Sequence, residues 1–262
     1  MVKPNVEILE SVLSTMDAAR ERLNTRVIRL EDDRPVPFAG LMAWEQTAGR
    51  GQRGRVWNSR PGESLCATYY FRHGLALPAE LGMVALLAGI AVAETISGLA
   101  SRLPSSTADI GLKWPNDVFL DGKKAGGILI ETERTPEGEM VALIGIGLNV
   151  GAGSFPPEFA STATSLENVG IPVKDLPKLA ASLAAALEAE AETFRQGGQS
   201  DLVARWRRWD RTPGRRFHTE HAGALVSGIA EGIDEGGRLL LRLNDETLLA
   251  VGSASTLQEA LS

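Results

Sequence analysis

Two long helical stretches constrain the fold of this chain most, because strand-like runs surround both of them. Residues 78–99 are almost entirely apolar and open with a proline, and residues 175–195 are rich in alanine, so each is predicted to form a helix. A third, shorter helix is predicted directly after residues 175–195, from 201 to 209. Strand-like runs lie at 8–13, 41–45, 64–71, 118–120, 127–131 and 140–150.

The turns between these runs favour a sheet that is mainly antiparallel. Asp121-Gly122 separates two of the runs, and such a dipeptide is typical of a β-hairpin. Ser14 and Asp17 have the spacing of a helix N-terminus, which predicts a helix from there to about Leu23. We therefore predict an α/β fold of the α+β kind, a mixed sheet with flanking helices.

The character of the chain changes at Thr212-Pro213-Gly214. Beyond this point only short strand candidates occur, separated by glycine turns, at 215–219, 225–230, 238–243 and 247–251. Short strands at regular spacing are typical of a small β-barrel. We place a domain boundary near Arg211, which gives one domain over 1–211 and a second over 212–262.

The charge balance argues against binding nucleic acid through the overall field. The 262 residues include 33 acidic and 27 basic side chains, a net charge of -6, so phosphate chemistry has to come from local basic clusters. The single cysteine, Cys66, lies in an apolar run and is predicted to be a buried structural thiol, which suits the reducing cytoplasm. The near-apolar run 81–93 is shorter than the ~20 residues of a membrane span, so no membrane contact is expected.

The segment Gly49–Trp57, GRGQRGRVW, interleaves arginines with glycines. Glycine lets the backbone approach a ligand closely, and arginine offers a fork that fits phosphate or carboxylate. A phosphate-bearing ligand with a base stacked on Trp57 would suit this loop. Taken alone, the segment is equally compatible with a solvated basic loop.

Two further clusters carry polar side chains beside glycines. KWPND at 113–117, followed by Lys123 and Lys124, can hold a triphosphate and Mg²⁺, although Pro-Asn-Asp is also ordinary turn chemistry. In GIGLN at 145–149 the glycines can admit a ligand beside a strand and the asparagine can read a base edge, although a twisted strand explains the same run.

Taken together and in this order, STMD, EQTAGRGQRGRVW, KWPNDVFLDGKKAGGILIE and GIGLNV resemble the catalytic domain of biotin–protein ligases. The segment GIAEGIDEGGRLLL resembles the SH3-like C-terminal domain of the same family, so the resemblance spans nearly the whole chain. It implies the fold shared by biotin ligases and class II aminoacyl-tRNA synthetases. It also implies biotin and ATP as substrates, Mg²⁺, a biotinyl-5′-AMP intermediate, and transfer of biotin to a lysine of a biotin carboxyl carrier protein of acetyl-CoA carboxylase.

The resemblance also assigns residues. Biotin-binding positions are Ser14, Thr15, Met16, Gln46, Arg50, Gly51, Gln52, Lys124 and Gly127. Positions for ATP or the adenylate are Arg50, Arg53, Arg55, Trp57, Lys113, Asn116, Gly147 and Asn149. Catalytic positions are Lys124, Arg53, Arg55, Lys113 and Asp117, with Mg²⁺ near Asn116 and Asp117.

Two of these positions need separate comment. The second step requires a neutral acceptor lysine, and only about one lysine in 2,500 is neutral at pH 7, so a carboxylate that takes the proton would help; Asp117 is our candidate. Gln52 departs from the family loop, which often reads GRGRRGR, and this predicts a weaker hold on the adenylate.

The alternatives are a lipoate–protein ligase or octanoyltransferase with the same fold, and a nucleotide-binding module without catalysis. Some family members also carry an N-terminal winged helix-turn-helix. Here STMD begins at Ser14, which leaves no room for one, so DNA binding is not expected. The oligomeric state is open between monomer and homodimer.

Overall fold

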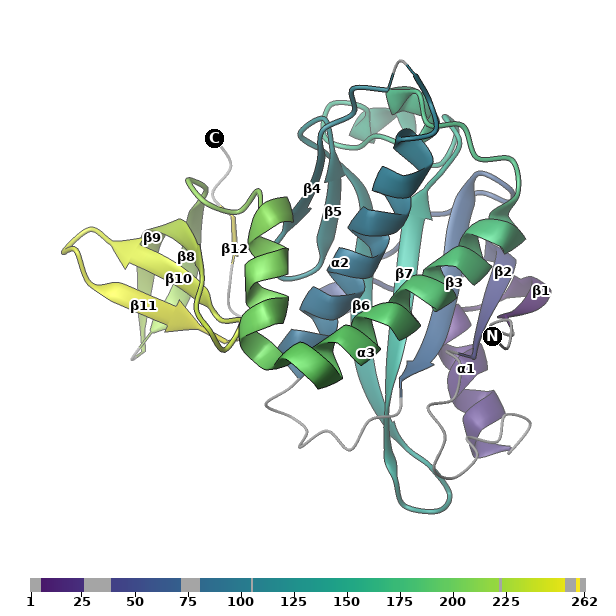
Figure 1. The fold of residues 1–262 in the computed structure, drawn as a ribbon, viewed down its shortest axis with the longest axis horizontal. Coiled ribbons are helices and arrows are strands. Elements are labelled where there is room, and N and C mark those ends of the chain that lie inside the picture. Colours follow the sequence, from purple (N-terminus) through teal and green to yellow (C-terminus); the bar gives the residue numbers. More distant parts are fainter. Residues whose placement is uncertain are drawn as a thin grey trace.

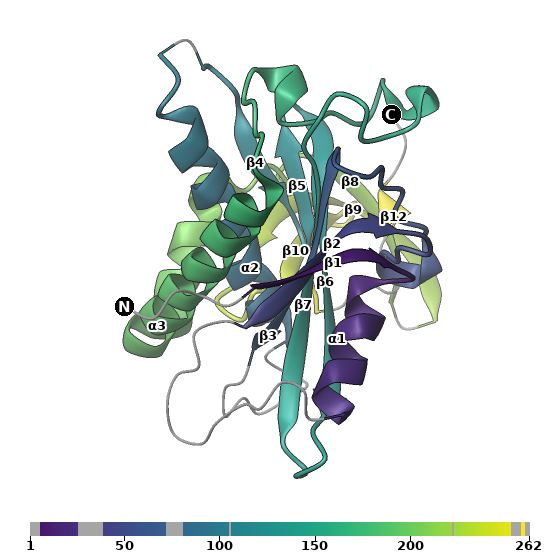
Figure 2. The same ribbon diagram turned by 90° about the vertical axis from the view of Figure 1, so that its right-hand side faces the viewer.

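The computed structural model describes residues 6–25, 39–71, 81–104, 106–221, 223–252 and 258–259. A seven-stranded sheet forms the centre of the molecule, with helices on both faces (Figures 1 and 2). Its strands lie in the order β1-β2-β3-β7-β6-β5-β4, and only the β1–β2 pair is parallel. Their bounds are β1 Val6–Val12, β2 Gly40–Gln46, β3 Ser64–Phe71, β4 Ile110–Lys113, β5 Asp117–Leu120, β6 Lys123–Arg134 and β7 Met140–Asn149.

Helices cover the two faces of this sheet unequally. α2 (Leu81–Ala100) and α3 (Leu176–Trp209) pack against each other on one face, and α1 (Thr15–Asn24) lies on the other (Figure 2). Three short 3-10 turns lie in connecting segments: η1 (Gln52–Gly54) between β2 and β3, and η2 (Pro157–Phe159) and η3 (Glu167–Val169) between β7 and α3. Ser14 caps α1, since its Oγ accepts from the Met16 N–H.

Strong apolar character makes α2 a core helix. It is 20 residues long, and its most apolar window has a mean hydropathy of 1.9, which matches the length and composition of a membrane span. The sequence-based argument that the apolar run at 81–93 is too short for a membrane span is therefore wrong, because the whole helix has the required length. What accounts for the hydropathy is packing: two thirds of that window (67%) is buried between the sheet and α3.

The C-terminal strands form a second, antiparallel sheet in the order β11-β10-β9-β8-β12, consistent with the predicted SH3-like domain. Their bounds are β8 Arg216–His221, β9 Ala224–Ile233, β10 Leu239–Leu243, β11 Leu248–Val251 and β12 Gln258–Glu259. One continuous cluster of buried side chains joins the two sheets, from Leu65 and Ile144 to Phe217 and Leu241. The indole N–H of Trp114 donates to the Gly237 carbonyl (2.9 Å) within it.

The predicted fold class is confirmed, and each strand-like run predicted for the first domain overlaps a strand of the structure. The pair of helices predicted at 175–195 and 201–209 is confirmed: α3 spans both, and Gly198, with a φ of 70° and a ψ of -163°, leaves the helical conformation and separates them. The predicted helix start at Pro78 lies outside the described residues. The boundary near Arg211 stays a prediction: it falls between α3 and β8, where the buried cluster is continuous.

Candidate active site

One cavity gathers most of the candidate residues. It has a volume of 520 Å³ and lies where the start of α1, the 49–57 loop, the centres of β6 and β7, and the 113–117 turn meet. Of the residues singled out from the sequence, these line it: Ser14, Thr15, Met16, Gln46, Arg50, Gly51, Gln52, Arg53, Arg55, Trp57, Lys113, Asn116, Asp117, Lys124, Gly127 and Gly147. Segments separated by about a hundred residues of sequence thus share one site.

The end of the cavity at α1 is polar and rigid. The Gln46 side-chain carbonyl accepts from both the backbone N–H (2.7 Å) and the hydroxyl (2.9 Å) of Thr15. The Thr68 hydroxyl donates to the Thr15 hydroxyl (2.9 Å) from below. Ser14 and Thr15 are buried, so these hydrogen bonds fix the side chains where a ligand would meet them.

The 49–57 loop folds as a tight hairpin over the cavity. Backbone hydrogen bonds join Gly51 N–H to the Arg55 carbonyl (2.8 Å) and Trp57 N–H to the Gly49 carbonyl (2.9 Å). At its tip Arg53 has a φ of 60°, in the left-handed region that few non-glycine residues occupy. The sharp turn separates the directions in which the three arginines point.

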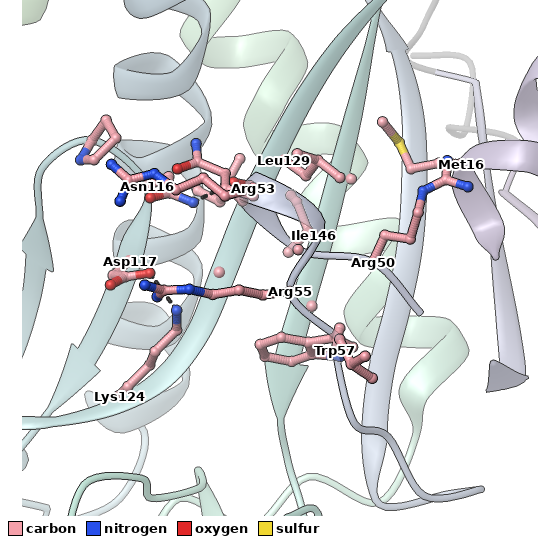
Figure 3. Close-up of a pocket in the computed structure, with 18 of the residues that line it drawn as sticks. Met16, Arg50, Arg53, Arg55, Trp57, Asn116, Asp117, Lys124, Leu129 and Ile146 are labelled. Carbon is pink, nitrogen blue, oxygen red and sulfur yellow. Dashed lines mark hydrogen bonds and ion pairs between the residues drawn. The ribbon is translucent and has the colours of Figure 1, made fainter. Parts of the chain in front are cut away.

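Arg50 points away from the other two arginines. Its guanidinium forms a double hydrogen bond with the Asp17 carboxylate (2.6 and 2.8 Å), next to Met16 (Figure 3). This hydrogen bond with Arg50 is the largest influence on Asp17 and holds the pKa of its carboxyl below the usual value. Arg50 thus anchors the loop to α1.

Arg53 and Arg55 reach toward Asn116 and Asp117 instead (Figure 3). Neither arginine forms an ion pair with a described residue, in contrast to Arg50. Burial and the nearby charge of Arg55 lower the pKa of Arg53. These two guanidinium groups are the cations of the loop that are available to an anionic ligand.

A chain of alternating charges crosses the opposite wall. Lys124 Nζ contacts Asp117 Oδ1 (2.5 Å), and Lys113 Nζ contacts Asp117 Oδ2 (3.2 Å) and Glu259 Oε2 (2.9 Å). Arg215 Nη1 completes it on Glu259 Oε1 (2.8 Å). Burial opposes the charge of Asp117, but the two lysines outweigh burial and lower the pKa of its carboxyl. Asp117 is therefore an ionised link between two lysines.

Trp57 packs flat against the β7 backbone. A Cβ built on Gly147 would lie 2.5 Å from indole Cε2 and 2.7 Å from Cζ2, so only glycine permits this approach. The ring thereby forms an aromatic surface inside the cavity, as the prediction of a stacking site requires.

Asn149 does not reach the cavity. Its side chain is 5% exposed, and its amide donates to the Thr164 carbonyl (2.9 Å). Asn116 does line the cavity, but its amide nitrogen donates to the Ile128 carbonyl (2.7 Å), so its amide is part of the turn. Both side-chain amides thus donate to backbone carbonyls of the protein, and these contacts do not support the predicted roles of Asn149 and Asn116 in binding ATP.

Several lining residues were not among the assigned site positions, although Val56, Trp114, Pro115, Gly145 and Ile146 lie within the three motifs. They are Val56, Cys66, Ala67, Trp114, Pro115, Ile128, Leu129, Gly145, Ile146, Phe217 and Glu259. Most are apolar strand residues, and only the alternation of β6 and β7 could have indicated them. Cys66 is buried as predicted, and burial raises the pKa of its thiol to about 11, which makes it a poor nucleophile.

The residues present do not fit a magnesium ion held by the protein. Both oxygens of Asp117 face lysine ammonium groups, and the described residues contain no cluster of three or more His, Cys, Asp or Glu side chains with metal-binding geometry. Mg²⁺ is usually held by one or two free carboxylates together with the phosphates of the nucleotide, and neither oxygen of Asp117 is free. The expected metal position between Asn116 and Asp117 is thus not supported by the donor set.

Comparison with known proteins identifies the family to which the chain is similar. Residues 39–150 match the Biotin/lipoate A/B protein ligase family. The chain is 35% identical to the biotin–[acetyl-CoA-carboxylase] ligase of Mycobacterium tuberculosis over 211 residues, which are 80% of this chain and 75% of the relative. The fold matches a biotin protein ligase from Aquifex aeolicus in complex with biotin and ATP, with a TM-score of 0.76 at 23% identity over 98% of this chain and 99% of the other.

A third relative combines sequence and structural similarity. The biotin protein ligase of Leishmania major in complex with biotinyl-5-AMP is 27% identical, with a TM-score of 0.61, over 95% of this chain and 98% of that one. The relative from Mycobacterium, above 30% identity over three quarters of its own length, is a biotin ligase and not a lipoate ligase. The chain therefore belongs to the biotin–protein ligase family.

Proposed function

We propose that the protein joins biotin to ATP to give biotinyl-5′-AMP and pyrophosphate, and then transfers the biotinyl group to a lysine of the biotin carboxyl carrier protein of acetyl-CoA carboxylase. The observation that carries this proposal is that one cavity joins a rigid polar end at Thr15 and Gln46 to a wall of cations at Lys113 and Lys124. Such a cavity suits a small neutral ring system whose carboxylate points toward phosphates.

In the first step the biotin carboxylate attacks the α-phosphorus of ATP, a new C–O–P linkage forms and pyrophosphate leaves. Negative charge gathers on the phosphates, so the step needs positioning and cations. We assign the biotin carboxylate to Lys124 and the phosphates to Arg53 and Arg55, all of which line the cavity. Trp57 offers the face on which adenine stacks. Magnesium would arrive with the phosphates of ATP, since the described side chains offer it no site.

In the second step the amine of the acceptor lysine attacks the activated carbonyl and AMP leaves. Asp117 is our candidate for the carboxylate that takes the proton of this amine; its contacts with Lys124 and Lys113 lower its pKa, so it passes the proton on to solvent. Asp117→Asn should therefore slow transfer from preformed biotinyl-AMP by about 100-fold. Single-turnover transfer to a carrier domain measures this rate, and an unchanged rate would show that Asp117 has no part in the step.

Gln52 lines the cavity at the loop tip but carries no charge. Gln52→Arg should place a third free cation near Arg53 and Arg55 and slow the escape of biotinyl-AMP several-fold, about two- to fivefold for one partly exposed charge. Release of radiolabelled biotinyl-AMP from each protein provides the measurement. Equal half-lives of release would reject a charge deficit at this position.

The direct test of the proposed function is mass spectrometry of a carrier domain incubated with the protein, biotin and Mg-ATP. One added biotinyl group on a single lysine supports the proposal. Lipoate in place of biotin tests the related activity, and pyrophosphate release without a carrier separates an enzyme from a passive nucleotide binder. We place this activity in the cytoplasm, where ATP is available and the buried Cys66 stays reduced.

A further inference from the structure

The C-terminal sheet sends one acidic side chain into the cavity. Glu259 lies on β12, which pairs with β8 at the edge of the small sheet nearest β4 and β5 (Figure 1). Its register partner Phe217 also lines the cavity. Every other lining residue belongs to the segment 14–147, so these two are the contribution of the C-terminal sheet.

Glu259 is tied to cations on both sides. Its Oε2 accepts from Lys113 Nζ (2.9 Å), and its Oε1 accepts from Arg215 Nη1 (2.8 Å). Both cations also lie over the Phe119 ring, at 5.1 Å from its centroid. Lys113 is only 14% exposed, so its ammonium has little water to compensate for a lost carboxylate.

The charge balance of this wall depends on Glu259. Lys124, Lys113 and Arg215 supply three cations against the carboxylates of Asp117 and Glu259, which leaves one net positive charge. Asp117 lies within the 113–117 turn and holds both lysines. Glu259 meets Lys113 from the other sheet and competes for the same ammonium that a phosphate would contact.

We propose that Glu259 competes with the phosphates of the nucleotide for Lys113 and thereby promotes the departure of pyrophosphate. The proposal rests on the proposed function in placing the β- and γ-phosphates at Lys113. When ATP binds, Lys113 exchanges the carboxylate for a phosphate. After the P–O bond to the α-phosphorus breaks, Glu259 takes Lys113 back, and the weakened hold on pyrophosphate opposes the reverse reaction while biotinyl-AMP waits for the acceptor.

The test is Glu259→Gln, which keeps the size of the side chain and removes its charge. We expect ATP and pyrophosphate each to bind about three- to tenfold more tightly, because one repulsive charge near the phosphates is gone. Biotin affinity should stay unchanged. The affinity for pyrophosphate should also fall more steeply with salt, since the wall then carries two net positive charges. Titration calorimetry with inorganic pyrophosphate and with ATP measures both effects.

Two controls separate this role from a structural one. Glu231→Gln removes a carboxylate of the same sheet that pairs with Arg242 and lies outside the cavity, and should leave both affinities unchanged. In a Lys113→Met background, Glu259→Gln should have at most a small effect, because the contested ammonium is absent. Melting temperatures confirm that each variant is folded.

Weaker or unchanged pyrophosphate binding in Glu259→Gln would overturn the proposal. Weaker binding would mean that Glu259 holds Lys113 in position for the phosphates. Unchanged binding would mean that the phosphates do not contact Lys113. Because these are binding measurements, they test the role of Glu259 even if the protein binds ATP without forming an adenylate. Absence of adenylate formation would refute only the proposed function.

Discussion

Lys124→Met should lower the rate of biotinyl-AMP formation by about 100- to 1,000-fold, the usual loss when one charged donor at a reacting group is removed. Methionine has nearly the length of lysine and no charge, so the cavity keeps its shape. The substitution also leaves Asp117 with Lys113 as its remaining lysine partner. Pyrophosphate release with saturating biotin and ATP reports the rate of this step.

The adjacent lysine provides a matched control. Lys123 Nζ donates to the Ala160 carbonyl (2.8 Å), and its side chain is not part of the cavity lining. Lys123→Met changes the same residue type one position away on the same strand, and its adenylation rate should match the unaltered protein. A similar loss in both variants would mean that the general charge of this edge matters, and not the proposed contact of Lys124 with biotin.

Gly147→Ala should raise the KM for ATP about tenfold and leave the KM for biotin nearly unchanged. The new methyl group would lie 2.5 Å from the Trp57 ring, closer than two carbon atoms approach, so the indole has to move. Stacking on an aromatic side chain contributes roughly 1–3 kcal/mol per base, and a displaced ring loses part of it. Steady-state kinetics with each substrate varied in turn would reveal the split.

Gly145→Ala is the counterpart two residues earlier on the same strand. There the methyl group would lie 3.1 Å from Met16 Sδ, at the end of the cavity expected to hold biotin. This variant should raise the KM for biotin more than the KM for ATP. If both variants change the KM values of the two substrates equally, the proposed division of the cavity into a biotin end near Met16 and an adenine end near Trp57 is incorrect.

Local chemistry explains why much of the fold was predictable. Asp121-Gly122 takes positive φ values at both residues and forms the turn between β5 and β6, as its composition indicates. Ser14 caps α1 because a short side chain can reach a backbone N–H two residues on. These features depend on neighbours in sequence, so a single chain reveals them.

Contacts between distant segments were not predictable in the same way. The sequence contains Asp17 and Arg50, but nothing local pairs them across 33 residues and turns that arginine away from Arg53 and Arg55 (Figure 3). Asn149 follows Gly145 and Gly147 at the two-residue spacing of a strand, which suggests that it shares their face. Its amide nevertheless donates to the Thr164 carbonyl and does not line the cavity. Glu259 could not be assigned at all, because its place depends on how the two sheets pack.

The continuous buried cluster has a consequence for how the domains of such enzymes can be exchanged. Trp114 belongs to the KWPND turn, yet its backbone N–H donates to the Thr212 hydroxyl and its indole donates to the Gly237 carbonyl. A C-terminal sheet from another ligase could be grafted here only together with the surface that receives this indole. The turn that carries Lys113 and Asp117 thus depends on the C-terminal sheet for its position.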